Sequence, residues 1–218
     1  MNRYLLRIGS VVLAAVVGFG AANFVNSQTG DKPKRFPQLT MEQLNDQQRP
    51  LAEKIMKISS VGIGGPYNPL LRSPKLAAQI YDLLDYLRWN SSVSRKLTEF
   101  AVLIIGRQWR SQVEWYAHYP LALKEGLPKQ VADDLKANRR PRNMTPDVEA
   151  VYDFCTELTT THEVSDATFN RLRQYLNDQQ IVDLTVLSGT YVTLAMVMSM
   201  AQESVPPGKE PPFKPGEP

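Results

Sequence analysis

Three ionisable residues lie in two short apolar stretches, and their types and spacing suit proton-transfer chemistry. Glu99 lies in residues 97–105, where Thr98 is the only other polar residue. Glu114 and His118 follow, four positions apart, which on a helix places them on one face about 6 Å apart. Because burial raises the pKa of a carboxyl group, such a group can act as an acid or a base near neutral pH. The three residues therefore form a candidate acid–base site.

Each residue also has an ordinary structural interpretation. Glu99 fits the solvated face of an amphipathic helix, and Glu114 with His118 fits a helix-stabilising pair worth a few tenths of a kcal/mol. Trp115 beside them suits the wall of a pocket, but it equally suits a protein core. Glu114 and His118 could in principle chelate one ion, but the only other histidine is His162. With so few ligands, we expect no metal.

The pattern of caps and apolar residues predicts an all-α fold. Thr40 and Gln43 form a capping box, and Ser73 with Pro74 marks a second helix start. Helices are expected at residues 40–58, 73–87, 94–109, 111–124 (kinked by Pro120), 128–137, 145–160, 165–176 and 178–202. No alternating strand pattern of useful length is present.

The last predicted helix, residues 178–202, is apolar on nearly every face. Such a helix is buried, either in a core or in an oligomer interface. Asp183 and Ser188 argue against a membrane span.

The two ends of the chain differ from its middle. Residues 1–27 have a basic start and a short apolar run, as in a secretory signal, and an uncleaved membrane anchor is the alternative. Residues 28–39 are predicted to be a linker, residues 40–203 the helical domain, and residues 204–218 an extended proline-rich tail. The protein is therefore expected to be exported, periplasmic or extracellular, with residues 1–27 as its only membrane contact if they are retained.

Charge and cysteine content exclude several classes of function. The net charge is +3, and removal of Arg3 and Arg7 with the leader lowers the 25 basic residues to 23, against 22 acidic ones. The arginines around Pro141 suit a polar turn, so no nucleic-acid partner is expected. Cys155 is the only cysteine, which rules out an intramolecular disulfide.

With these residues placed, residues 40–203 resemble the carboxymuconolactone decarboxylase family, whose superfamily includes the alkylhydroperoxidase D-like proteins. The resemblance rests on the sequence GPYNPLLRSP at residues 65–74 and on residues 99–126, especially EWYAHYPLA at 114–122. The sequence GTY at 189–191 also fits. The resemblance implies an all-helical fold that assembles as trimers or hexamers.

The resemblance also implies the class of chemistry. The peroxidase branch has a glutamate, a Cys-x-x-Cys motif and a histidine. Setting Glu99 on that glutamate places Ser111 and Glu114 at the cysteine positions and His118 at the histidine. A thiol peroxidase needs a thiolate and a resolving partner, and neither side chain can be oxidised and re-reduced in that way. The pattern instead resembles the decarboxylase branch, which needs no cofactor.

We therefore expect a cofactor-independent lyase or isomerase that acts on a small carboxylated lactone or keto acid. His118 is the candidate proton donor, held by Glu114, while Glu99 orients His118 or shuttles the proton. Arg72 is a candidate for binding a substrate carboxylate, with Trp115 and Tyr191 lining the site. The exported location argues against carboxymuconolactone itself, because aromatic-ring catabolism normally runs in the cytoplasm.

Two other functions remain open from the sequence. One is a non-enzymatic exported helical oligomer that binds a small acid or a protein partner. The other is a redox protein, which the absence of a dithiol disfavours.

Overall fold

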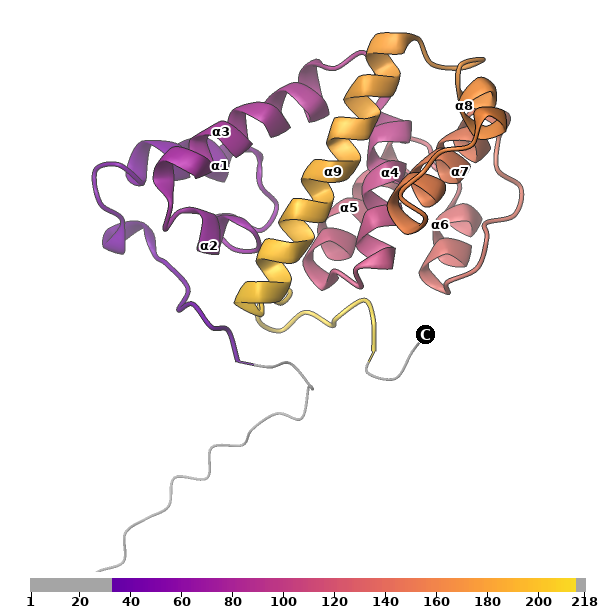
Figure 1. Ribbon diagram of the computed structural model, residues 1–218. Coiled ribbons are helices and arrows are strands. Elements are labelled where there is room, and N and C mark those ends of the chain that lie inside the picture. Colours follow the sequence, from indigo (N-terminus) through magenta and orange to yellow (C-terminus); the bar gives the residue numbers. More distant parts are fainter. Residues whose placement is uncertain (1–32, 215–218) are drawn as a thin grey trace, which may run out of the picture. The chain divides into compact units, whose positions relative to one another are not determined.

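The computed structural model describes residues 33–214, which contain helices and no strand, so the all-α prediction is confirmed (Figure 1). The predicted leader, residues 1–27, lies outside the described residues, as do residues 28–32 of the predicted linker and 215–218 of the tail. The elements are η1 (Met41–Gln43), α1 (Arg49–Ile58), α2 (Tyr67–Leu70), α3 (Pro74–Asp85), η2 (Tyr86–Asn90), α4 (Arg95–Gln108), α5 (Gln112–Lys124), α6 (Lys129–Lys136), α7 (Pro146–Thr160), α8 (Asp166–Leu172) and α9 (Asp178–Ala201).

Four stretches differ from the predicted helices. The helix expected over 165–176 ends at Leu172. The helix expected over 40–58 is divided into η1 and α1, because the Asn45 side chain accepts the backbone N–H groups of Gln47 and Gln48 in a local turn. The loop expected over 61–72 contains the short helix α2. The helix from Pro74 continues through η2, which is a π-helical turn.

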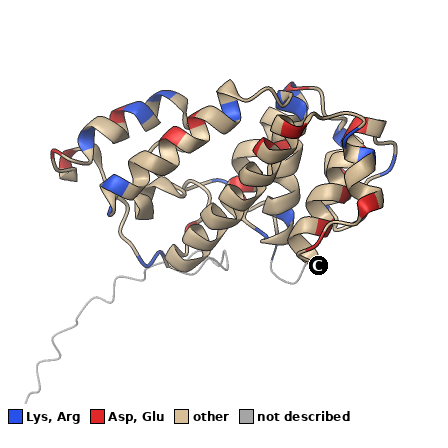
Figure 2. Cartoon of the chain, turned by 45° about the horizontal axis from the view of Figure 1, so that its top comes forward, with Lys and Arg blue, Asp and Glu red and all other residues tan. Residues whose placement is uncertain are grey.

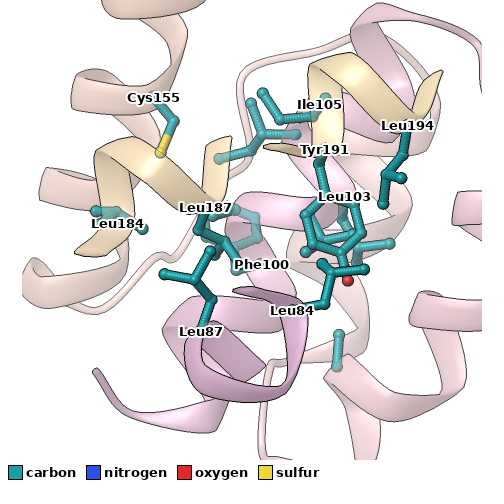
Figure 3. Close-up of a cluster of buried hydrophobic side chains, with 14 of the residues drawn as sticks. Leu84, Leu87, Phe100, Leu103, Ile105, Cys155, Leu184, Leu187, Tyr191 and Leu194 are labelled. Carbon is teal, nitrogen blue, oxygen red and sulfur yellow. The ribbon is translucent and has the colours of Figure 1, made fainter. Parts of the chain in front are cut away.

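The helix α4 forms the centre of the core. Every residue from Leu97 to Arg107 is buried, and α4 packs against α5, α6, α7 and α9. Figure 3 shows the core where side chains of α3, η2, α4, α7 and α9 meet, with Leu84, Phe100, Leu187 and Tyr191 among them. Glu99 therefore lies in the fully buried stretch of α4.

The long helix α9 buries one side and exposes the other. Its buried side includes Leu184, Leu187 and Leu194, as the prediction of a buried helix requires. Its opposite side exposes Val182, Val186, Gly189, Thr193, Met196 and Met200. Of the described helices, α9 alone is long and apolar enough to span a membrane, yet more than half of its apolar stretch is buried within the protein. Figure 2 shows the charged residues on the outer helices and few along α9.

The arginines around Pro141 are engaged in ion pairs. Arg139 and Arg142 both bind the buried carboxylate of Asp134, at 2.6 and 3.2 Å. Arg140 bridges Glu149 and Asp153 of α7. These contacts fasten the loop between α6 and α7, in agreement with a structural polar turn.

The segments at the two ends of the described chain pack against the helical domain. Before α1, Lys34 pairs with the buried Glu203 at 2.7 Å. After α9, Phe213 is buried in edge-to-face contact with Trp115 of α5, with ring centroids 5.2 Å apart. The side-chain amide of Gln112 donates to the Phe213 carbonyl at 2.7 Å and accepts from the Phe213 N–H at 2.9 Å. The described part of the proline-rich tail contains a turn, in which the Lys209 N–H donates to the Pro206 carbonyl at 3.1 Å, and its Phe213 lies against α5.

Candidate active site

A short connection places the two key helices side by side. Only residues 109–111 separate α4 from α5, and Arg110 has a left-handed φ of 48°, a conformation that non-glycine residues rarely adopt. The chain thus reverses direction: Gly106 near the end of α4 faces Glu114 near the start of α5, and Glu99 faces His118 farther along. The two stretches singled out in the sequence are neighbours for this reason.

Glu99 and His118 form a buried pair. Nδ1 of His118 lies 2.6 Å from Oε2 of Glu99, and Arg95, one turn earlier on α4, donates to Oε1 at 2.8 Å. Arg88 adds a looser contact, with Nη2 3.8 Å from Oε1 of Glu99. Both carboxylate oxygens of Glu99 therefore have partners, as a buried charge requires.

These contacts fix the charges of the pair. Burial alone raises the pKa of Glu99, but His118 together with Arg88 and Arg95 lowers it below its ordinary value. For His118, burial lowers the pKa, and the two arginines lower it further against the opposing effect of Glu99. We therefore assign an ionised Glu99 and a neutral His118 whose Nδ1–H donates to it, a tautomer inferred from the contacts.

The second ring nitrogen of His118 points toward α9. Nε2 lies 3.3 Å from the hydroxyl of Tyr191, and the two rings meet edge to face with centroids 5.2 Å apart. With Nδ1 protonated, Nε2 carries the lone pair and accepts from this hydroxyl. His118 thus offers a basic nitrogen on the side opposite Glu99.

Glu114 is also buried, but its surroundings differ. Among the described residues, neither carboxyl oxygen has a hydrogen-bond partner of good geometry, although the hydroxyl of Ser111 lies near enough to lower its pKa slightly. Burial dominates and raises the pKa of Glu114 to about 8. At neutral pH this side chain is therefore mostly a neutral carboxylic acid.

Glu114 and His118 line one cavity of about 140 Å³. Tyr191 of α9, Tyr67 of α2 and Arg88 and Trp89 of η2 also line it. Most of the remaining wall is aliphatic. The arrangement provides a neutral acid, a basic imidazole nitrogen and a guanidinium around an apolar space, which suits the movement of protons on a small molecule.

The structure brings some predicted site residues together and separates others. Glu114, His118 and Tyr191 line the cavity, and Glu99 lies behind His118. The expected Glu114–His118 contact is absent among the described hydrogen bonds and ion pairs, because Glu99 occupies Nδ1 of His118. The alternative role for Glu99, orienting His118, agrees with the geometry.

Arg72 and Trp115 are not among the residues that line this cavity, so the structure does not place them against a molecule bound there. Arg72 donates to the backbone carbonyls of Asn68 and Pro37, and its guanidinium stacks on Phe36. It therefore fastens the N-terminal segment to α2. Trp115 packs against Tyr119 and Phe213 in the core beneath the tail.

Three residues at the site, Arg95, Arg88 and Tyr67, were not predicted from the sequence. Arg95 could have been found, because it lies four positions before Glu99 on the same predicted helix. Arg88 and Tyr67 gave no such signal. They reach the cavity from η2 and α2 through packing that the sequence pattern does not specify.

Cys155 is remote from this chemistry. It is fully buried between α7 and α9, with its sulfur 3.7 Å from the Ser188 hydroxyl. Burial raises the pKa of the Cys155 thiol to about 12, which leaves almost no thiolate at neutral pH. Across residues 33–214, no group of three or more histidine, cysteine or acidic side chains is placed to bind a metal ion.

Comparisons with known proteins support the fold. No family model and no curated protein matches the chain. An uncharacterised peroxidase-related protein from Ralstonia eutropha, solved as an alkylhydroperoxidase AhpD core, superposes with a TM-score of 0.66 at 18% identity and covers 78% of this chain and 90% of its own. A protein of unknown function from Agrobacterium tumefaciens, described as an AhpD candidate in antioxidant defence, superposes with a TM-score of 0.58 at 20% identity, covering 64% and 96%.

Proposed function

We propose that this chain, which has the all-helical fold of the alkylhydroperoxidase D-like proteins, is a cofactor-independent lyase or isomerase. Its substrate is a small carboxylated lactone or keto acid that binds in the cavity beside Glu114 and His118. The observation that carries the proposal is that a neutral buried carboxylic acid, Glu114, and a neutral histidine oriented by a carboxylate, His118, line the same cavity.

The roles of the residues follow from their protonation states. In a decarboxylation, the bond between the substrate carbon and its carboxylate breaks, CO₂ leaves, and the electron pair remains on the carbon as an enolate. The Glu114 carboxyl then transfers its proton to that carbon and becomes a carboxylate, which solvent reprotonates. In an isomerisation, Nε2 of His118 accepts a proton from the substrate while Glu114 supplies one at the other carbon.

This assignment moves the role of proton donor from His118 to Glu114. A donor must hold its proton at the working pH, and burial keeps Glu114 protonated up to about pH 8. His118 is neutral and bound to Glu99, so it suits the role of a base. Pairs of groups whose surroundings push their pKa values apart are typical of acid–base sites.

Peroxidase activity of the thiol type is disfavoured for this chain. Ser111 and Glu114 stand where the dithiol of that branch is expected, and the single cysteine is buried with a raised pKa. No residue at the cavity offers the thiolate that such chemistry needs.

Location and assembly are also part of the proposal. Residues 1–27 support export to the periplasm or beyond, with membrane attachment if the leader is retained. The exposed apolar side of α9, including Val182 and Met196, supports a homo-oligomer, which we propose to be a trimer or hexamer. Light scattering of the purified mature chain tests the assembly, and a single-chain mass would contradict it.

The proposed reaction is tested with a panel of small lactones and keto acids that carry one carboxylate. CO₂ release and deuterium incorporation from D₂O are followed by NMR. Replacing Glu114→Gln or His118→Ala should lower turnover by on the order of 10²–10⁴-fold with the helical circular dichroism unchanged. Glu149→Gln, an exposed carboxylate on α7, is the matched control and should leave turnover unchanged. Full activity in both site variants would contradict the proposal, and binding without product would favour the non-enzymatic alternative.

A further inference from the structure

Arg88 has an unusual position for an arginine. It lies on the π-helical turn η2, an element that occurs frequently at functional sites. Its side chain is only 11% exposed and lines the cavity with Glu114 and His118. Its guanidinium stacks on Trp89 at 5.1 Å, so the side chain is held at the cavity wall.

The partners of Arg88 within the protein are incomplete. Its closest carboxylate contact is the 3.8 Å approach of Nη2 to Oε1 of Glu99. Arg95 already occupies that oxygen at 2.8 Å, and His118 occupies the other at 2.6 Å. Among the described residues, Nε of Arg88 has no hydrogen-bond partner. A buried guanidinium with so little compensation favours an added anion.

The charges around the cavity also favour the binding of an anion. Arg88 and Arg95 are two cations, and Glu99 is the single ionised carboxylate beside them. Glu114 supplies no second negative charge at neutral pH, because burial raises its pKa to about 8. His118 is neutral at that pH. The group therefore carries one uncompensated positive charge.

We propose that Arg88 is the anion-binding residue of the cavity, and that the site selects small molecules with one carboxylate and an apolar body. The inference rests on the proposed function in placing the substrate in this cavity, and it identifies the residue that recognises the substrate. It also explains why Arg72, which is occupied by backbone carbonyls, is not needed for that task.

The rest of the wall sets the size and polarity of the bound molecule. Aliphatic side chains from several elements surround the space, including Ile58, Val61, Leu84, Val113, Leu121 and Leu194. A cavity of about 150 Å³ accepts benzene, and this one measures about 140 Å³. One ring or a short branched chain fits beside the guanidinium.

Anion binding should depend on the protonation of Glu114. The other titratable groups that line the cavity with Glu114 are Arg88 of η2, Tyr67 of α2, Tyr191 of α9 and His118 of its own helix. Glu99 of α4 lies behind His118. Above about pH 8, Glu114 ionises and places a negative charge in the same cavity, which opposes the binding of an anion. Affinity for an anion is therefore expected to fall as the pH rises through this range.

The test uses benzoate, with benzamide as its neutral counterpart of the same shape, and calorimetry on the full mature chain. The wild type should bind benzoate more tightly than benzamide. Arg88→Met should weaken benzoate binding by on the order of 10–100-fold and remove this preference, because hydrogen bonds to a charged group are lost. Arg88→Lys should retain part of it, and Arg173→Met, at an exposed ion pair beside α9, should behave as wild type.

Several outcomes would overturn the inference. They are equal binding of the two probes by the wild type, no benzoate binding at millimolar concentration, and unchanged benzoate preference in Arg88→Met with an intact fold. Loss of the pH dependence in Glu114→Gln supports the coupling, whereas the same fall above pH 8 in that variant contradicts it.

Benzoate is not a reacting substrate, so selective binding without turnover on the lactone panel would refute the proposed function alone. Turnover in Arg88→Met at the wild-type rate and KM would refute this inference alone.

Discussion

Glu99 and Glu114 are two glutamates buried to nearly the same extent on adjacent helices, but they are in opposite states. Glu99 is surrounded by Arg95, His118 and Arg88, and its pKa is lowered. Glu114 lacks a well-formed hydrogen bond within the described residues, and its pKa is raised to about 8. Burial is the same for both, so the partners decide the charge.

Because of this difference, the two glutamates have different roles at the site. The ionised glutamate is enclosed behind His118 and holds the imidazole in one orientation. The neutral glutamate lies on the cavity wall, where its proton can reach a bound molecule. The Glu99 carboxylate therefore orients His118, while the neutral Glu114 carboxyl group is available for proton transfer.

The largest expected effect comes from removing the charge of Glu99. Glu99→Gln leaves Arg95 and Arg88 without their shared counter-ion, and we expect a loss of about 3–5 kcal/mol in the free energy of unfolding at pH 7. The same change at Glu114 replaces one neutral group by another and should cost less than about 1 kcal/mol. Urea denaturation of both variants measures the two losses in the free energy of unfolding. Equal losses would contradict the assignment of a charged Glu99 and a neutral Glu114.

A smaller effect is expected in the pH dependence of stability. The Glu114 carboxyl ionises near pH 4.5 when unfolded but near 8 when folded, so the native state holds an extra proton between these values. The free energy of unfolding should fall by about 2 kcal/mol from pH 6 to pH 8 through this group. In Glu114→Gln that part of the fall should disappear, while a wild-type slope in the variant would argue against a neutral Glu114.

Glu99 contributes in the opposite direction. Its folded pKa lies below its unfolded value, so its stabilisation is present above about pH 4.5 and is lost as the pH falls through the folded pKa. Stability curves of the two Gln variants should therefore depart from wild type at opposite ends of the pH range.

The smallest effect concerns Cys155, another buried acid with little compensation. Its pKa is raised to about 12 for the same reason as that of Glu114, which predicts an inert thiol. A coloured disulfide reagent should react with Cys155 only after denaturant is added. Rapid labelling of the native protein would show that the region around Cys155 opens readily, and a redox function of this thiol would again have to be considered.

The sequence was sufficient for the fold class because the helix signals are local. Ser94 precedes α4 and Ser165 caps α8, accepting the Thr168 N–H at 3.3 Å. The interruption at Asn45 was not predicted, since it depends on a side chain competing for backbone N–H groups in a stretch that otherwise reads as helix. The π-helical turn at η2 also had no distinct pattern.

The sequence singled out Glu99, Glu114 and His118, which the structure brings together, but not the contacts among them. A spacing of four suggested that Glu114 holds His118, yet a residue on a neighbouring helix, Glu99, takes that place. Helical spacing shows which residues share a face, while the partner across the interface depends on how α5 returns along α4. Arg88 was not predicted because it reaches the cavity only through tertiary packing.

The most direct test of the central claim is the titration of the two glutamates by ¹³C NMR, with carboxyl signals assigned by the Glu99→Gln and Glu114→Gln variants. The Glu114 signal should move with a midpoint near pH 8, while Glu99 should stay ionised down to below pH 4.5. A Glu114 signal that titrates near pH 4.5, alongside Glu99, would show that the two glutamates are in the same state.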